Sequence, residues 1–99
     1  MSVQVLVCYD VMTSDEGGAR RLRRIADACL DHGVRVQYSV FECVLQDPQW
    51  VLLRRRLLEE FDPQKDSLRF YFLAADDFGR REHHGARQPV DPKGPLIVD

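Results

Sequence analysis

Apolar residues recur along the chain with two different spacings, and together they predict alternating strands and helices. Runs of β-branched, aromatic and other apolar residues, typical of buried strands, cover 3–9, 34–45 and 68–73. Apolar residues recur every three or four positions over 22–29 and 50–61, which is the spacing of amphipathic helices. No single alternation explains 34–45, so we expect two short strands joined by a bend or bulge near Tyr38. The predicted order is strand, helix, strand, strand, helix, strand.

Polar residues and prolines predict where the two helices begin and end. Thr13 and Glu16 have the spacing of a capping box ahead of the first helix, and Gly33 follows its last apolar position. Residues 47–48 are Asp-Pro, which predicts an N-cap followed by proline at the first helical position. A second Asp-Pro pair at 62–63 is expected to end that helix.

This order of elements predicts an α+β domain with a ferredoxin-like βαββαβ arrangement, in which both helices cover one face of an antiparallel sheet. The other sheet face is then apolar and needs a cover, so we expect a homodimer formed through the sheet face. Residues 1–75 form the expected domain, and 76–99 form a C-terminal tail that contributes to the dimer. The apolar triplet 96–98 is the candidate for an extra edge strand.

Length and composition describe one small globular domain. The chain has 99 residues, of which 44% are hydrophobic, and no apolar run approaches the roughly 20 residues that span a bilayer. The start of the sequence has no basic leader, so we expect no signal peptide, no membrane partner and a cytoplasmic location. The three cysteines (Cys8, Cys29 and Cys43) lack metal-site spacing and are expected to be reduced core residues. The histidines (His32, His83 and His84) are expected to be solvated.

The distribution of basic residues points to phosphate binding, although the net charge is −2. Twelve of the 14 basic residues are arginine, whose planar guanidinium suits bidentate contact with phosphate. One dense group lies in the first predicted helix: Arg20, Arg21, Arg23 and Arg24. Helical spacing predicts that all four point away from the apolar stripe, so they are the candidate nucleic-acid-binding residues; a solvated helix face is the alternative.

Asp10 is the candidate metal ligand because it closes the first predicted strand. A carboxylate at the end of a buried strand has to be exposed, paired or metal-bound. Magnesium takes oxygen ligands and often only one or two protein carboxylates, so Asp10 from both subunits of a two-fold dimer would hold one Mg²⁺ per dimer. The alternative is that Asp10 only caps the turn over 9–11.

Four segments together carry a resemblance to a known family. They are Tyr9-Asp10-Val11, Arg21-Leu22-Arg23, the run 33–43 (GVRVQYSVFEC) and the run 66–71 (DSLRFY). In these segments the chain resembles the small CRISPR-associated Cas two proteins, the non-integrase member of the pair that acquires new spacers. The tail over 82–98 is similar to that of the branch found beside type I-C interference genes.

The resemblance implies a homodimer that binds Mg²⁺ through Asp10 and cleaves RNA or double-stranded DNA during spacer acquisition, with a Cas one integrase as partner. The positions that match residues tied to nuclease function are Tyr9, Arg21, Arg23, Arg35 and Phe41, with Ser39 in the same motif. Two alternatives stay open. One is a non-catalytic, DNA-holding scaffold for the integrase, and the other is a toxin-like endoribonuclease.

Overall fold

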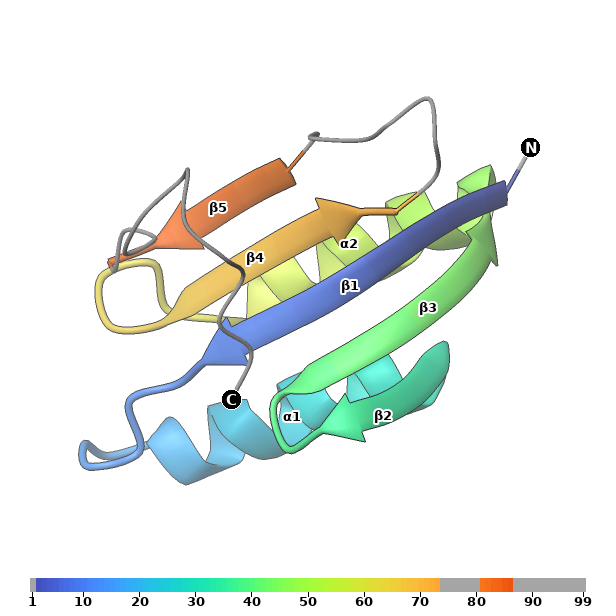
Figure 1. Ribbon diagram of the computed structural model, residues 1–99. Coiled ribbons are helices and arrows are strands. Elements are labelled where there is room, and N and C mark those ends of the chain that lie inside the picture. Colours follow the sequence, from blue (N-terminus) through green and yellow to red (C-terminus); the bar gives the residue numbers. More distant parts are fainter. Residues whose placement is uncertain (1, 74–80, 87–99) are drawn as a thin grey trace.

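The computed structural model describes residues 2–73 and 81–86, which form five strands and two helices (Figure 1). In chain order these are β1 (Ser2–Asp10), α1 (Gly18–Leu30), β2 (Gly33–Gln37), β3 (Val40–Gln46), α2 (Asp47–Glu60), β4 (Ser67–Phe72) and β5 (Arg81–Gly85). Within the described ranges, no helix is long and apolar enough to cross a membrane.

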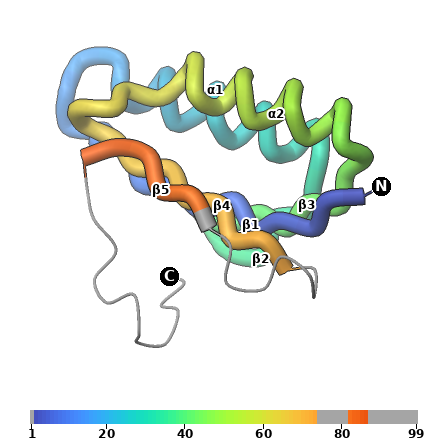
Figure 2. Tube along the Cα trace, turned by 90° about the horizontal axis from the view of Figure 1, so that it is seen from above, coloured from blue at the N-terminus to red at the C-terminus, as the bar shows by residue number. Residues whose placement is uncertain are grey.

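The five strands form one sheet in the order β2-β3-β1-β4-β5, and every neighbouring pair is antiparallel. Both helices pack on the same side of this sheet, and among the described residues no helix covers the other face (Figure 2). This confirms the predicted α+β, ferredoxin-like class. An extra C-terminal strand is also present, and it pairs with the free edge of β4.

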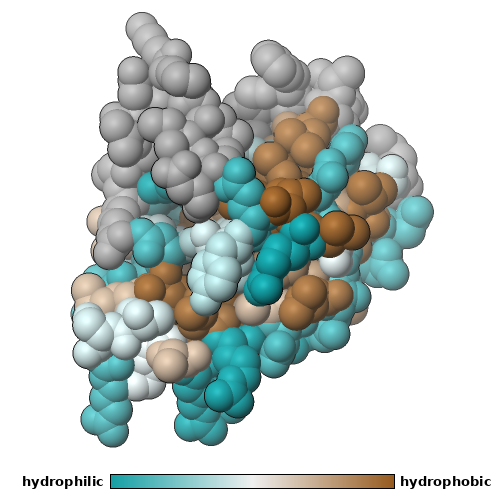
Figure 3. Space-filling model, turned by 60° about the horizontal axis from the view of Figure 1, so that its bottom comes forward, coloured by the Kyte–Doolittle hydropathy of each residue, from teal (hydrophilic) through white to brown (hydrophobic). Residues whose placement is uncertain are grey.

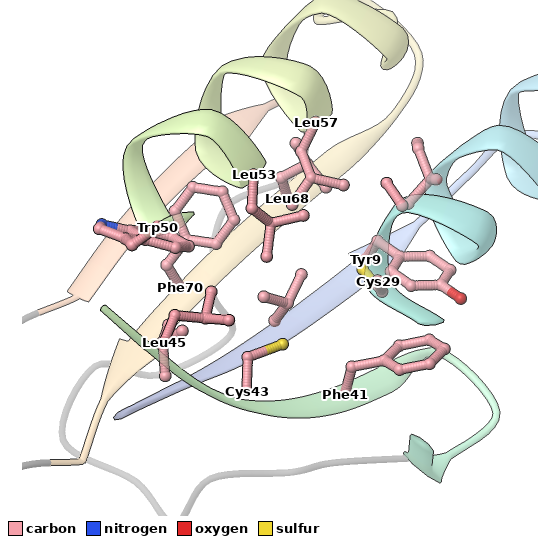
Figure 4. Close-up of a cluster of buried hydrophobic side chains, with 14 of the residues drawn as sticks. Tyr9, Cys29, Phe41, Cys43, Leu45, Trp50, Leu53, Leu57, Leu68 and Phe70 are labelled. Atoms are coloured by element: carbon pink, nitrogen blue, oxygen red, sulfur yellow. The ribbon is translucent and has the colours of Figure 1, made fainter. Parts of the chain in front are cut away.

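Alternation along the central strands directs one face of the sheet into the core. Val5, Val7 and Tyr9 of β1 are buried beneath the helices, whereas Asp10 is exposed. From α2, Trp50 meets the ring of Phe70 edge-on at 5.0 Å between centroids. Further large side chains of this core come from β3, β4 and α2, among them Phe41, Leu53, Leu57 and Leu68 (Figure 4), and α1 contributes Ile25. The apolar positions that predicted the strands and helices therefore build this single core.

The bend expected near Tyr38 is confirmed. Strand β2 ends at Gln37, a turn follows, and β3 begins at Val40. The register between β2 and β3 shifts between Arg35 and Gln37, as a β-bulge requires. This turn lies beside the end of β1, because the amide of Tyr9 donates a hydrogen bond of 3.1 Å to the carbonyl oxygen of Ser39.

The face of the sheet opposite the helices carries exposed apolar side chains. Val34 and Val44 are 68% and 64% exposed, and Val36 is 49% exposed. Hydrophobic residues gather on this side of the molecule among hydrophilic ones (Figure 3). An exposed apolar sheet face is typical of an interaction surface. The predicted homodimer through this face stays a prediction, since the structure holds one chain.

Both helices begin differently from the sequence prediction. Helix α1 begins at Gly18 after a left-handed Gly17 (φ 90°), and no side chain caps its first turn, so the capping box of Thr13 and Glu16 does not form. Only glycine adopts this conformation at little cost, which explains the entry. Helix α2 begins at Asp47 with Gln46 as N-cap, because the amide of Gln46 bonds to the side chain of Gln49, three residues on.

The C-terminal segment also differs. The structure shows an extra strand at β5, which the sequence did not predict, while the triplet 96–98 lies outside the described residues and its strand stays a prediction. His83 and His84 belong to β5 and are half-buried, so the prediction that they are solvated was wrong. Burial and the nearby Arg69 lower the pKa of His83. The sequence of β5 is polar and therefore did not predict a strand. Its pairing is determined by the open edge of β4.

Candidate nucleic-acid interface

Asp10 lies at the C-terminal end of β1, opposite Ser67 of β4. It is exposed, and alternation places it on the open face of the sheet, since Tyr9 before it points beneath the helices. Within the part of the chain that the structure describes, no group of three or more His, Cys, Asp or Glu side chains is placed to hold a metal ion. One chain therefore offers a carboxylate to a cation, and further ligands have to come from elsewhere.

The other predicted catalytic residues gather on the helix side of the sheet. Tyr9 and Phe41 are buried and stack with 6.2 Å between ring centroids, at the α1 end of the core (Figure 4). The guanidinium of Arg35 lies 5.0 Å from the centroid of the Phe41 ring. Ser39 joins the group through its backbone carbonyl, which accepts from Tyr9. Strand alternation thus separates this cluster from Asp10 of the same chain.

Interactions inside the cluster define its charge. Arg35 lies 5.7 Å from the centroid of the Tyr38 ring, and its positive charge acts to lower the pKa of Tyr9. Burial raises the pKa of Tyr9, and this outweighs the lowering effect of Arg35, so the phenol is neutral at physiological pH. Arg35 is therefore the charged group of the cluster, and the aromatic rings hold it in place.

Three of the four arginines predicted on α1 are exposed, namely Arg20, Arg23 and Arg24. Arg24 forms an ion pair of 3.5 Å with Glu60 of α2. Arg21 differs, because its Nε donates to Asp66 at 2.8 Å and its side chain is only 17% exposed. The prediction that Arg21 points outward was wrong, since its guanidinium is bound to a buried carboxylate that lies 45 residues away in sequence.

Asp66 is the centre of this buried contact. Its side chain is fully buried and also accepts hydrogen bonds from the amides of Met12 (3.0 Å) and Asp62 (2.9 Å). Burial raises the pKa of Asp66, but the hydrogen bonds from Arg21 and the two amides outweigh it and hold the pKa below its usual range. The ionised carboxylate ties the loop that follows β1 to the loop that precedes β4.

The arginine and lysine around this contact are neutralised by acids. Asp15 accepts from Lys65 at 2.6 Å and from Arg21 at 3.3 Å. The hydrogen bond from Lys65, assisted by Arg21, lowers the pKa of Asp15 despite some burial. In α2, the three consecutive arginines also pair with acids: Arg54 with Glu82, Arg55 with Glu59 and Arg56 with Asp31. These groups are occupied within the chain, so Arg20, Arg23 and Arg35 are better placed to meet phosphate.

Two residues of this region were not predicted from the sequence. Tyr38 is 73% exposed, although most aromatic side chains are at least partly buried. The position of Tyr38 in the turn between two strands was the feature of the sequence that could have predicted this exposure. Asp66 precedes the strand β4, and a carboxylate at a strand start is by itself no sign of a buried ion pair.

Magnesium fits the donor chemistry of Asp10 only in part. The exposed carboxylate is the ligand type that Mg²⁺ prefers, and Mg²⁺ keeps several waters and accepts one or two carboxylates. A second copy of the chain across the open face would supply the second carboxylate. Asp10 is thus the residue that would hold the ion.

Comparison with known proteins supports one family. The profile of the family described as CRISPR associated protein Cas2 matches residues 3–81. The chain is 58% identical over 94 residues to the CRISPR-associated endoribonuclease Cas2 of Nitratidesulfovibrio vulgaris, covering 95% of this chain and 92% of that protein. It is 46% identical over 93 residues to the CRISPR-associated endonuclease Cas2 of Halalkalibacterium halodurans, covering 94% and 97%.

A solved structure agrees with these relatives. Streptococcus pyogenes Cas2, crystallised at pH 6.5, superposes with a TM-score of 0.67 and 44% sequence identity. The match covers 75% of this chain and 89% of that chain. At 44% sequence identity the two proteins share more than the fold.

Proposed function

This chain belongs to the CRISPR-associated Cas2 family, and we propose that it is a metal-dependent nuclease that acts as a homodimer in spacer acquisition. The names of the relatives, endoribonuclease and endonuclease, support hydrolysis of phosphodiester bonds. We extend the proposal to a Cas one integrase as partner and to the type I-C branch on the strength of the sequence resemblance alone.

The observation that carries the proposal is the position of Asp10. It is an exposed carboxylate on the open sheet face, the same face that bears Val34, Val36 and Val44. Docking of two copies through these valines would remove apolar area from water. A two-fold axis that passes through this interface beside the end of β1 would bring Asp10 of both copies to one shared cleft.

Asp10 of each copy would hold Mg²⁺, which when bound acts as a Lewis acid on the phosphate and lowers the pKa of a bound water. The chain itself contributes orientation and charge. Exposed cations of α1 such as Arg20 and Arg23 lie on the helix side of the sheet, so they would bind phosphates of the strand away from the scissile bond and help to hold the nucleic acid on the protein.

The test replaces Asp10 by asparagine and follows cleavage of labelled single-stranded RNA and of duplex DNA, with Mg²⁺ and with chelator. We expect a rate at least about 100-fold lower, because losing even a supporting partner of a metal ligand costs about 10–100-fold. The matched control is Asp27→Asn, which changes an exposed carboxylate on α1. Circular dichroism and the molar mass of both variants should equal those of the wild type. Cleavage by Asp10→Asn at the wild-type rate would reject the assignment.

The exposed arginines of α1 favour a second candidate function, a non-catalytic scaffold that holds duplex DNA for the integrase. This function predicts salt-dependent, sequence-indifferent DNA binding that survives Asp10→Asn. Arg20→Ala should weaken binding more than Arg55→Ala, which removes an exposed arginine that is paired with Glu59 on α2. Affinity that does not change between low and high salt would contradict it.

The toxin-like reading differs in its substrate. It predicts that expression of this chain alone cleaves ribosomal or messenger RNA and slows growth, whereas the spacer-acquisition function predicts neither.

A further inference from the structure

A surface pocket of about 240 Å³ lies where α1 meets the end of β1 and the strand β2. Helix α1 contributes positions spaced by three or four residues, which therefore share one face. The small side chains of Ala19 and Ala26 leave space there, and Arg23 stands between them. Leu22 of α1 also lines the pocket, and Tyr9, Arg35 and Tyr38 contribute the remaining side chains from the strands and the turn. The pocket thus combines two guanidinium groups with two phenol rings.

The charges and rings of this pocket suit an anion that carries an aromatic group. Arg23 and Arg35 are both exposed, and no carboxylate is among the described residues that line the pocket. Tyr38 presents most of its ring to solvent, since it is 73% exposed. Arg35 is held in position by its contacts with the rings of Tyr38 and Phe41. A positioned guanidinium beside an exposed ring is the arrangement on which unpaired bases stack.

The pocket is separate from the candidate metal ligand. Tyr9 and Arg35 belong to the helix side of the sheet, because Tyr9 is buried beneath α1 and Arg35 pairs with the buried Phe41. Asp10 lies on the open side. Tyr9, Arg35 and Phe41 therefore lie on the opposite side of the sheet from the carboxylate of Asp10 in the same chain. Nucleic acid that contacts these three residues therefore binds at a second site on the chain.

We propose that this pocket binds one unpaired nucleotide of a single strand, with its base stacked on Tyr38 and its phosphate bound by Arg23 and Arg35. The volume of about 240 Å³ is below the roughly 300–1,000 Å³ of pockets for drug-sized ligands, which suits a single base. A base within a duplex is covered by its neighbours on both faces, so the pocket selects single strands. The inference rests on the proposed function in one respect, that the chain binds nucleic acid.

The test measures binding without cleavage, in the Asp10→Asn background. The probe is a short single-stranded RNA that carries one 2-aminopurine, whose fluorescence falls when the base stacks on an aromatic ring. We expect quenching by the parent protein, and loss of quenching with a Kd about 5- to 150-fold higher for Tyr38→Ala. Tyr38→Phe retains the ring and should bind and quench as the parent does. Leu52→Ala, an exposed apolar residue of α2, is the matched control and should change neither quantity.

A second pair of variants tests the phosphate contact. Arg23→Ala should weaken binding and flatten the dependence of log Kd on log salt by about 0.7, the value for one phosphate contact of a single strand. Arg55→Ala removes the same charge outside the pocket and should leave the slope unchanged. Because Tyr38 and Arg23 are exposed, these variants are expected to fold, and circular dichroism checks this.

The outcomes separate this proposal from the nuclease proposal. The pocket would be overturned if Tyr38→Ala bound the single strand as tightly as its parent does. It would also be overturned if a duplex of the same sequence bound as tightly as the single strand and responded to Tyr38→Ala in the same way. Quenching that depends on Tyr38 in a chain that never cleaves RNA or DNA would support the pocket and overturn only the nuclease.

Discussion

Replacing Asp66 by alanine removes the carboxylate that joins the loop after β1 to the loop before β4. Asp66 is fully buried and accepts hydrogen bonds from the amides of Met12 and Asp62 and from the guanidinium of Arg21. Alanine has no acceptor, so the two amides lose their partner at this site while the surrounding chain stays packed. The variant should therefore be less stable although it alters no candidate substrate contact.

The magnitude follows from the bonds lost. A hydrogen bond to a charged group contributes about 1.5–3 kcal/mol, so the two backbone bonds alone set an expected loss of at least about 3 kcal/mol. In a domain of about this size each kcal/mol lowers Tm by about 4–8 °C, which corresponds to about 12–24 °C. Asp66→Asn keeps one acceptor oxygen and should show about half of this loss.

Thermal unfolding followed by circular dichroism measures the effect, at one fixed chain concentration because Tm of an oligomer depends on concentration. Asp27→Asn is the control for the loss of one acid, since Asp27 is exposed on α1. The reasoning would be refuted if Asp66→Ala melted at the temperature of the control.

The pH dependence gives an independent check of the same carboxylate. The pKa of Asp66 is lowered in the folded chain, so its contribution to stability is present above the pKa of an unfolded aspartate, about 3.9. That contribution is lost as the pH falls below this value and through the folded pKa. The free energy of unfolding of the wild type should fall more steeply on acidification below about pH 4 than that of Asp66→Asn.

Two further predictions concern a glycine and the thiols. Gly85→Ala should lower Tm by several degrees, because Gly85 has φ 118° and an added Cβ would meet the carbonyl of Asp66. Gly17→Ala, also at positive φ but with only an ordinary van der Waals contact to the Arg21 side chain at 3.7 Å, should cost less, and the reverse order of Tm values would contradict the explanation. Burial raises the pKa of Cys8 and Cys43 to about 11, so little thiolate forms at pH 8. Alkylation of both by iodoacetamide should be roughly 100-fold slower in the folded chain than in urea, and equal rates would show that the thiols are accessible.

Some of the candidate site follows from local sequence, and some depends on contacts between distant residues. Asp10 could be predicted because a strand is recognised from its own residues and its last position is then known. Its exposure agrees with that prediction. Tyr38 and Arg23 could not be assigned to one pocket from the sequence, because the turn after β2 and the face of α1 meet only when α1 packs against the sheet. The metal, the dimer and the partner proteins remain predictions.

The sequence by itself determined the element order, the bend at Tyr38 and the apolar stripe of α2, because periodicity and turn chemistry act over a few neighbouring residues. Tertiary structure decided the direction of Arg21, the entry of α1 at Gly18 and the strand β5. Each of these depends on a contact with β4 or with the loop before it. Arg21 binds Asp66, and β5 pairs with the edge of β4. The segment that leads into α1 is held by the contact of Asp15 with Lys65. A buried charge or an added strand is stabilised only by a partner that folding brings close, so its position cannot be predicted from local pattern alone.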